Sequence, residues 1–596
     1  MKRSQKLLTV VLAASVLFSM ASCTGSGNSG GHIHQNSDAS KPEYIPTEPT
    51  SPIDPGVTEC PPSEIEEDII DFTMYINYVS SDDKDYDNDI KEAIASKTGV
   101  RVEESYLVGL TADEAISAII ASGKYPDYID AGDSSYELYQ NGVLIAWDSY
   151  LEMYPELKSL YTDEEWDMFR QDDGHIYWAN VFERYHDKNT ATTHNSQAFW
   201  IQVRVLEWAG YPKIETLDEY FDLLERYAEA NPVMPDGTEI IPYTCLCEDW
   251  RYFCIESAPM YLDGYPNNGC VNVSVEDGVN NPKVIDYNTT ETAKNYFRKL
   301  NEEYYKGIVD PDFAVQTYDE YTAKLCSGRV LGMCDQYWDF AYNLKWIYDS
   351  PLSDINGDTY TLSDIGCDYV PLALVAEKGM ENRYHDYDSS INTASGIAVT
   401  TSCIDPDRAF KFLNDLLTQE IHDLRFWGIE GEDYLVDSNG LYYRTPEMRD
   451  NWSDNRYKDS HTCEYSYMPQ WKGMSHDGFN RMMPSEQPAE FKSTLPAPVV
   501  KCFEAYAVGN YVEMLGSVEE DIYPWYPLWT WSNLLTDNTA SGRAWQAIGE
   551  CKHEWLPKVV LSPNFDDTWA EYMEAYKKCN PQVFIDAAQA EVENRI

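Results

Sequence analysis

Basic residues are scarce in this sequence. Lys and Arg number 44 together, against 101 Asp and Glu, and the formal net charge is −57. A protein that binds nucleic acid or another polyanion needs a positively charged footprint. Here the acidic residues are spread along the whole chain and leave no basic region. The charge balance therefore argues against nucleic acid as a partner and, less strongly, against an anionic glycan.

The sequence also lacks the short motifs of several enzyme classes. It has no Gly-x-Ser-x-Gly turn, no His-Glu-x-x-His pair and no Gly-rich phosphate loop ending in Lys. A glycosidase needs two carboxylates on either side of the bond that it cleaves. Among 101 acidic residues, close pairs are common, and the cluster Glu430, Glu432 and Asp433 is typical of a solvated turn. We therefore expect no enzymatic activity and no cofactor.

Cysteine spacing gives no metal site. Cys245, Cys247 and Cys254 lack the second cysteine pair of a structural zinc site. The chain has 14 cysteines, and the 13 that follow Cys23 are an odd number that cannot all pair within one chain. We expect buried thiols in place of a disulfide framework.

One acidic segment has part of a calcium-binding pattern. Asp354-Ile-Asn356-Gly-Asp358 matches the first, third and fifth positions of an EF-hand loop. Thr359 stands where that loop requires Gly, and Ile365 where it requires a bidentate Glu. We predict no metal for the chain and leave open whether the Asp354–Asp358 segment binds calcium.

Beyond the N-terminus, the sequence has no run of 18 apolar residues. At the N-terminus, Lys2, Arg3 and Lys6 precede an apolar stretch, and Met20-Ala-Ser-Cys23 resembles a bacterial lipobox. We expect residues 1–22 to be a lipoprotein signal peptide and Cys23 to carry the lipid, a palmitate-type anchor. Residues 23–67 are rich in Gly, Ser, Pro, Thr and Asn and are predicted to be a disordered tether. The expected location is the extracytoplasmic face of the bacterial cell membrane.

The order of periodic segments predicts an α/β fold. At 596 residues the chain is too long for one core, so two lobes are expected. Strands are predicted at Asp68–Val79, Val100–Ser105 and Tyr128–Ala131, with a helix at Asp87–Thr98 and another after Thr111, where Glu114 completes a capping box. Alternating strands and helices are typical of a doubly wound, largely parallel sheet.

Three segments carry a resemblance to a known family. In the first, Ala121-Ser-Gly123 is followed by Pro126-Asp127, by the strand residues Tyr128-Ile129, and by Leu144 to Asp148. In the second, the strand Ala198–Gln202 is followed by Gly210, Pro212, Thr216 and Glu219. In the third, Gly428-Ile-Glu-Gly431 follows a predicted helix, Asp405–Trp427. This order resembles the family 1 extracellular solute-binding lipoproteins of bacterial ABC importers for carbohydrates.

The resemblance implies both a fold and a function. The fold would be periplasmic-binding-protein-like, type II, with two doubly wound lobes joined by a hinge of crossing strands near residues 190, 335 and 395. The N-terminal lobe would hold 68–193 plus 336–394, and the C-terminal lobe 194–335 plus 395–596. The protein would be a monomer that binds a neutral oligosaccharide in the inter-lobe cleft and delivers it, chemically unchanged, to the transmembrane subunits of an ABC permease.

A neutral sugar needs aromatic faces for its C–H groups and carboxylates or amides for its hydroxyls. The resemblance assigns Asp133 and Trp338 to the ligand site. Loop context and residue type add the remaining candidates: Tyr136, Asp249, Trp250, Trp471, Trp525 and Trp529. For any single Trp among these candidates, a place in the hydrophobic core is about as well supported as a place in the ligand site. Trp427 and Trp555 lie in helical patterns and are expected to be core residues.

Two other functions remain open from the sequence. A surface lipoprotein that hydrolyses or eliminates glycans would use some of the many carboxylates, and a peptide-binding lipoprotein of the same fold would bind charged termini. The sugar, its linkage and length, and the partner permease are not given by the sequence.

Overall fold

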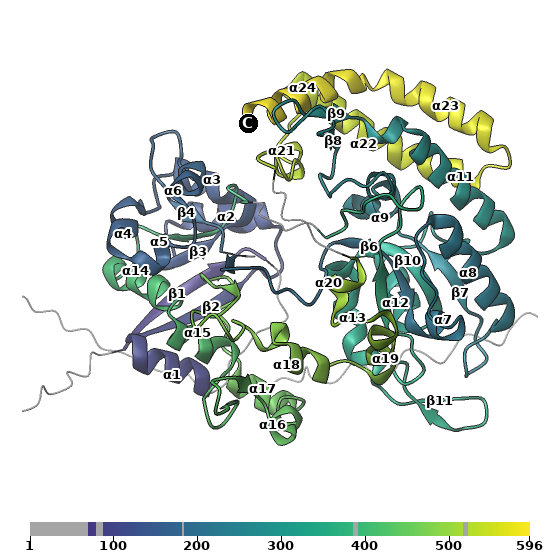
Figure 1. The fold of residues 1–596 in the computed structure, drawn as a ribbon. Coiled ribbons are helices and arrows are strands. Elements are labelled where there is room, and N and C mark those ends of the chain that lie inside the picture. Colours follow the sequence, from purple (N-terminus) through teal and green to yellow (C-terminus); the bar gives the residue numbers. More distant parts are fainter. Residues whose placement is uncertain (1–68, 79–87, 182–183, 386–390, 517–522) are drawn as a thin grey trace, which may run out of the picture. The chain divides into compact units, whose positions relative to one another are not determined.

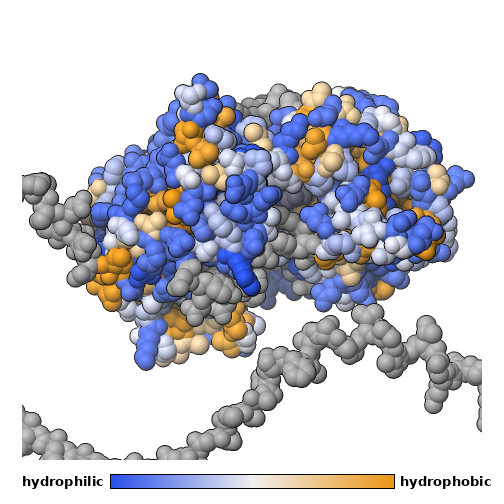
Figure 2. Space-filling view, turned by 90° about the horizontal axis from the view of Figure 1, so that it is seen from below, coloured by the Kyte–Doolittle hydropathy of each residue, from blue (hydrophilic) through white to orange (hydrophobic). Residues whose placement is uncertain are grey.

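The computed structural model describes residues 69–78, 88–181, 184–385, 391–516 and 523–596 (Figure 1). The predicted signal peptide, the tether and Cys23 lie outside the described residues. Among the described residues, no helix combines the length and the apolar composition needed to cross a bilayer. On the face drawn in Figure 2, hydrophilic residues predominate and apolar residues gather in small separate patches.

The first sheet has five strands in the order β2-β1-β3-β14-β4. They are β1 (Ile70–Ile76), β2 (Val100–Tyr106), β3 (Tyr128–Asp130), β4 (Trp178–Ala179) and β14 (Ile397–Val399). β1 runs parallel to β2 and β3, whereas β14 is antiparallel to both β3 and β4. The sheet is therefore mixed, not largely parallel as predicted. We call this sheet and the side chains packed on it the first lobe.

Local signals in the sequence set the helices of the first lobe. α1 (Asp89–Thr98) begins at Asn88, which accepts a hydrogen bond from the Lys91 amide, and α2 (Ala112–Ser122) begins at the predicted capping box of Thr111 and Glu114. The predicted helix at 405–427 is instead two helices, α14 (Pro406–Asp415) and α15 (Gln419–Phe426), because Thr418 adopts an extended conformation between them. The other helices on this stretch of chain are α3 (Ser135–Gln140), α4 (Asp148–Met153), α5 (Pro155–Lys158), α6 (Asp163–Met168), α16 (Pro446–Asn451) and α17 (Asn455–His461).

The second sheet has four strands in the order β13-β6-β10-β7. They are β6 (Gln197–Gln202), β7 (Ile241–Thr244), β10 (Val330–Gln336) and β13 (Tyr369–Leu372). β10 runs parallel to β7 and antiparallel to β6, which is buried along its whole length. We call this sheet and its packed side chains the second lobe. A strand buried on both faces must be covered by other elements on each side.

Helices supply that cover in the second lobe. α7 (Val203–Trp208) and α8 (Leu217–Ala230) precede β7, and α11 (Glu291–Lys306) and α12 (Tyr318–Cys326) precede β10. The C-terminal helices include α22 (Ala540–Leu561), α23 (Phe565–Lys578) and α24 (Pro581–Asn594), drawn in yellow in Figure 1, and their buried apolar side chains belong to the same core. The remaining helices are α9 (Phe253–Glu256), α10 (Ala258–Leu262), α13 (Tyr337–Tyr348), α18 (Pro488–Ser493), α19 (Ala497–Tyr506), α20 (Tyr511–Met514) and α21 (Trp529–Ser532).

Short two-stranded sheets complete the described part of the chain. They pair β5 (Tyr185–His186) with β17 (Lys472–Gly473), β8 (Asn272–Ser274) with β9 (Lys283–Ile285), β11 (Leu352–Ser353) with β12 (Thr359–Tyr360), and β15 (Leu435–Val436) with β16 (Tyr442–Tyr443). The segment Asp354–Asp358 is the turn between β11 and β12. Both the Asn356 and Asp358 amides donate to Asp354 Oδ1, so this carboxylate is used to hold the turn.

The strand pairings correct the predicted lobe boundaries. β13 pairs with β6 in the second sheet and β14 pairs with β3 in the first, so most of 336–394 belongs to the second lobe. Most buried apolar side chains between Ile397 and Met482 belong to the first core, and most of those from Phe491 onward to the second. The chain therefore passes between the lobes near 190 and before 397, as predicted. The third passage lies between 482 and 491 and not near 335.

Gly332, in the middle of β10, has no room for a side chain. A Cβ atom there would lie 2.0 Å from the Tyr220 hydroxyl and 3.0 Å from the Trp200 carbonyl oxygen, which that hydroxyl already contacts. We expect Gly332→Ala to lower the free energy of unfolding by about 1–3 kcal/mol, as overpacking a core does. The matched variant is Gly549→Ala in α22, where a Cβ meets nothing within 4 Å. Gly549→Ala should raise the free energy of unfolding by about 0.5–1 kcal/mol. A denaturant titration that shows equal effects for Gly332→Ala and Gly549→Ala would contradict this packing.

Two histidines join the first two connections between the lobes. His194 Nε2 lies 3.0 Å from the Gln197 carbonyl oxygen, to which it donates, so His194 Nδ1 accepts from His385 Nδ1 at 3.0 Å. Burial lowers the pKa of His194 to about 3 and that of His385 to about 4. Both rings are therefore neutral at physiological pH.

This pair makes the protein less stable in mild acid. Above pH 6.5 the histidines are neutral in both states, but below it the unfolded chain takes up protons that the folded His194 does not. Between pH 6.5 and pH 5, His194 lowers the free energy of unfolding by about 2 kcal/mol, at about 1.36 kcal/mol per pH unit. Denaturant titrations should show a shallower loss of stability from pH 7 to pH 5 in His194→Asn than in the unchanged protein. Equal slopes in the two proteins would contradict the assignment.

Candidate functional site

The candidate site begins at one edge of the second sheet. β7 and β10 are parallel, so their carboxyl ends meet at the same edge. The chain after β7 forms the short 3-10 helix η2 (Asp249–Tyr252) and then α9, and the chain after β10 enters α13 directly. In open α/β sheets, ligands bind in the loops beyond the carboxyl ends of the strands.

Two tryptophans lie in parallel at this edge. The ring centroids of Trp250 and Trp338 are 5.7 Å apart with an angle of 7° between the planes, and Phe253 is about 6 Å from both. We call these three residues the tryptophan platform. Trp250 is 54% exposed and Trp338 41% exposed. Tyr342, one helical turn beyond Trp338, is also exposed, so a broad aromatic surface faces solvent.

Arg251 supports the platform from the protein side. Its guanidinium lies 4.4 Å from the ring centre of Trp250 and 3.8 Å from that of Tyr318. Its Nε donates to Asp339 Oδ1 at 2.9 Å, and Asp339 is buried. A cation held between two rings and a buried carboxylate restricts the rotamers of its neighbours. The platform is thus fixed in place before any ligand arrives.

Beneath the platform lies a buried acidic group at the end of β10. Asp335 Oδ1 accepts from the Gln336 amide at 2.7 Å and from the Cys254 thiol at 3.2 Å, and Oδ2 accepts from the Tyr321 hydroxyl at 2.6 Å. Burial and the nearby Asp339 raise the pKa of Asp335 to about 7. Burial also raises the pKa of the Cys254 thiol, which is therefore protonated at neutral pH.

The first lobe presents polar and aromatic groups at the corresponding edge of its own sheet. Asp130 ends β3 and is buried, which raises the pKa of its carboxyl group to about 6. Asp133 is exposed three residues later, in the 3-10 helix η1 (Gly132–Ser134). Tyr78, just after β1, stacks on Tyr467 with ring centroids 5.6 Å apart. We call Tyr78, Asp133 and Tyr467 the first-lobe edge.

Gly132 is required at that edge. Its φ angle is +57°, and a Cβ atom would lie 3.2 Å from the Tyr78 hydroxyl. Glycine therefore lets the chain turn out of β3 while Tyr78 lies directly against it.

The structure places the predicted ligand residues in different environments. Trp250 and Trp338 come together in the platform, and Asp133 is exposed at the first-lobe edge. Tyr136 is exposed on α3, where its hydroxyl donates to Asp172 Oδ2 at 3.2 Å. Asp249 lies in η2 beside Trp250, and its side chain is not among those described.

The other predicted tryptophans do not form platforms. Trp471 packs in the core of the first lobe and Trp525 in that of the second, where it stacks on Tyr523. Both are wrong as ligand faces because their rings are surrounded by protein. Trp529 is half-buried, with its Cβ atom against Gly269. Trp427 is buried, as expected for a core residue, and Trp555 packs partly buried against the second core.

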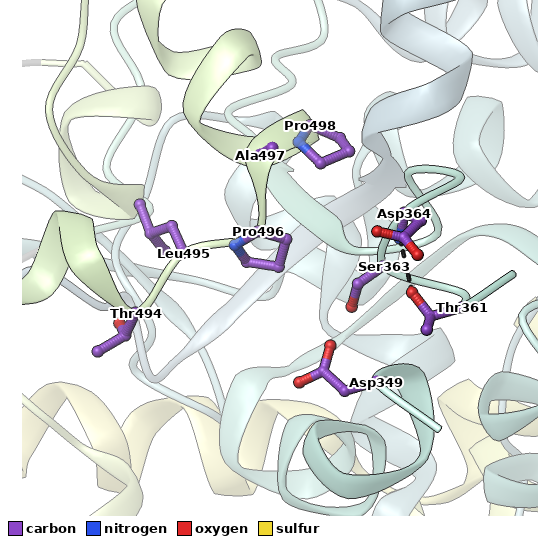
Figure 3. A pocket seen from close by; sticks show the side chains of 9 residues that line it. All are labelled: Asp349, Thr361, Ser363, Asp364, Thr494, Leu495, Pro496, Ala497 and Pro498. Carbon is purple, nitrogen blue, oxygen red and sulfur yellow. Dashed lines mark hydrogen bonds between the residues drawn. The ribbon is translucent and has the colours of Figure 1, made fainter. Parts of the chain in front are cut away.

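Two surface pockets lie outside the platform. One, of about 210 Å³, is bounded by Asp349, the loop 361–364 and the segment 494–498 (Figure 3). Its side chains include prolines and a leucine but no aromatic ring, so it offers no face for a sugar. The other, of about 380 Å³, lies in the first lobe and is lined by Tyr139, Tyr177 and Asp173, with Gln140, Gly142 and Leu144.

Several residues of the site were missed from the sequence. Arg251 is next to a predicted ligand residue, and Asp130 lies in the predicted strand Tyr128–Ala131, so both carried a local signal. Tyr467 is more than three hundred residues from its partner Tyr78, and the sequence offered no sign of that contact.

Comparison with known proteins supports the fold. No family model and no curated protein matches the sequence. An HMO-binding, ABC-transporter-associated solute-binding protein from Bifidobacterium longum infantis has a TM-score of 0.56 at 15% identity, over 88% of this chain and 98% of the other. The S. pneumoniae substrate-binding protein FusA in complex with kestose has a TM-score of 0.54 at 15% identity, over 88% and 99%.

A further extracellular solute-binding protein, from Bifidobacterium longum subsp. infantis, has a TM-score of 0.56 at 14% identity, over 88% of this chain and 98% of the other. At these identities the comparisons bear on the fold. The described chain has the two-lobe α/β fold of solute-binding proteins, which confirms the fold class predicted from the sequence.

Proposed function

We propose that this protein is the substrate-binding lipoprotein of an ABC importer and that its ligand is a neutral oligosaccharide. The observation that carries the proposal is the exposed, parallel pair Trp250 and Trp338 at the carboxyl edge of the second sheet. The solved structures with the same fold include proteins described as binding HMO and kestose. Nothing in the proposed function requires a chemical change in the ligand.

The chemistry of the platform fits a sugar. One face of a pyranose or furanose ring carries C–H groups, which pack on an aromatic ring, while the hydroxyls at its rim need acceptors. Trp250, Trp338 and the neighbouring Tyr342 supply a surface larger than one sugar ring, which favours an oligosaccharide over a monosaccharide. The net charge of −57 disfavours an anionic glycan.

The proposed binding mode uses both lobes. The ligand stacks on the tryptophan platform, and the first-lobe edge closes over it, with the Asp133 carboxylate accepting from sugar hydroxyls. Closure occurs by bending at the connections between the lobes, and the closed form is the one that the permease recognises. The lipid on Cys23 and the tether 23–67 hold this monomeric domain at the outer face of the cell membrane.

A thermal-shift screen of the full chain tests the proposal. With Cys23→Ser to prevent lipidation, the protein is heated with each member of a panel of neutral and acidic oligosaccharides and peptides. A ligand at about 100 times its Kd adds about 2.7 kcal/mol of stability, so neutral glycans of one class should raise Tm. The glycan should be recovered at its original length by chromatography. A shift with peptides alone contradicts the carbohydrate assignment, and a shortened glycan contradicts the transport assignment.

A further inference from the structure

Three buried side chains beneath the tryptophan platform bring their donor atoms together. Cys254 comes from α9, Asp335 from the end of β10 and Asp339 from the first turn of α13. One potential ligand atom from each lies within 4.8 Å of the other two, and all three residues are at most 2% exposed. Cys254 and Asp335 are 81 residues apart in the chain, so the sequence alone does not reveal the group.

The hydrogen bonds of this group leave one atom unused. Both oxygens of Asp335 accept hydrogen bonds, and Asp339 Oδ1 accepts from Arg251. Asp339 Oδ2 is buried and has no hydrogen-bond partner among the described residues. A buried carboxylate oxygen without a partner is costly and uncommon, so it points to a bound group.

We propose that Cys254, Asp335 and Asp339 bind one divalent transition-metal cation of the zinc type. Its ligands are Cys254 Sγ, one carboxylate oxygen of Asp335, and Asp339 Oδ2, while Asp339 Oδ1 keeps its bond to Arg251. Zinc binds sulfur and carboxylate oxygen at about 2.0–2.3 Å. Ligands of one ion must therefore lie close together, as the donor atoms of these three residues do, within 4.8 Å of one another.

Charge and ligand type select the cation. The Cys254 thiol loses its proton to water as the metal–sulfur bond forms, so the site holds a thiolate and two carboxylates beside the Arg251 cation. A divalent cation makes this group neutral overall, which a buried site requires. Calcium and magnesium prefer sites made only of oxygen atoms, so the thiolate favours a softer metal.

The metal would stabilise the base of the platform. The ligand Asp339 is adjacent to Trp338 in the chain. Arg251, which donates to Asp339, is adjacent to Trp250, so the metal would help to hold both rings in place. The inference does not depend on what the platform binds. It stands or fails on the metal alone.

Cobalt titration of the full chain with Cys23→Ser tests the site, because Co²⁺ substitutes for zinc and its thiolate bond absorbs in the near ultraviolet. We expect one Co²⁺ per chain with a thiolate charge-transfer band, displaced by Zn²⁺ and not by Ca²⁺. The absence of a saturable band overturns the proposal, because the carboxyl groups would then share a proton and bind no metal.

Variants locate the metal. Cys254→Ser should abolish the band, and Asp339→Asn should weaken Co²⁺ binding at least about tenfold, since even outer partners of a metal contribute that much. Cys502→Ser, at a cysteine equally buried in the second core, should leave the band and the affinity unchanged. Circular dichroism confirms that each variant is folded. If the band survives Cys254→Ser, or is lost equally in Cys502→Ser, the metal is bound elsewhere and the proposal is overturned. If Cys254→Ser does not fold, an unchanged Co²⁺ affinity in Asp339→Asn overturns the proposal.

Discussion

Replacing Trp338 by Ala should weaken oligosaccharide binding by about 30-fold or more. Removing a central aromatic contact from a binding surface costs about 2 kcal/mol or more, and each 1.4 kcal/mol is a factor of ten in Kd. Trp250→Ala should lose a similar amount, because the two rings form one surface and Phe253 packs against both. Fluorescence titration with a glycan that raises Tm measures both losses.

Trp208→Ala is the matched control for these variants. Trp208 lies on α7 of the second lobe, away from the carboxyl edge of the sheet, and is 45% exposed, close to the exposures of Trp250 and Trp338. Its loss should leave the Kd unchanged within experimental error. If Trp208→Ala and Trp338→Ala bind equally well, the platform is not the ligand site.

Replacing Arg425 by Met should destabilise the protein by at least about 3 kcal/mol. Arg425 lies on α15 and is 2% exposed, and burial lowers the pKa of its guanidinium to about 10. It donates to four main-chain carbonyl oxygens, those of Leu416, Glu464, Tyr465 and Pro469. Methionine fills much of the volume but leaves these buried oxygens without donors, each at about 1–3 kcal/mol.

We expect this arginine to affect ligand binding as well. Three of the four carbonyls, those of Glu464, Tyr465 and Pro469, belong to the segment that carries Tyr467, the partner of Tyr78 at the first-lobe edge. Denaturant titration measures the stability, and Arg226→Met is the control. Arg226 is exposed, and its one ion pair within the described part of the chain is with Asp222 on its own helix. That change should stay within about 0.5 kcal/mol of the unchanged protein. Equal losses for the two arginines would contradict the role given to Arg425.

The sequence predicted well those features that depend on neighbouring residues. The helix start at Thr111 is confirmed as a capping box, because the hydroxyl and the Glu three residues on favour a helix start there. The strands that became β2, β3 and β6 were found within two residues of their ends, because each is a short segment next to turn residues.

Features set by distant contacts were not predicted. The family resemblance implied a passage to the first lobe near 335, at the end of β10, but the next element, α13, packs on the same sheet. Nothing local distinguishes the two outcomes, because the choice depends on whether β13 pairs with β6 or with a strand of the first sheet. The division of the predicted helix 405–427 at Thr418 was also missed, because the apolar pattern continues through that residue.

The candidate site was predicted in part for the same reason. Trp250 was predicted from its loop context and Trp338 from the family resemblance, and the two follow the ends of β7 and β10. Trp471 and Trp525 also stand in loop-like sequence, but distant segments fold over them. Burial of a loop residue depends on elements hundreds of residues away, and a single sequence does not report it.

Calorimetric titration with recovery of the ligand tests the central claim most directly. The full chain carrying Cys23→Ser is titrated with the neutral oligosaccharide that gives the largest rise in Tm, and the glycan is then recovered and its mass measured. The account predicts one binding site per chain, loss of most of the heat in Trp338→Ala, and a glycan of unchanged mass. Heat that is the same in Trp338→Ala, no binding of any neutral glycan, or a shortened glycan would contradict it.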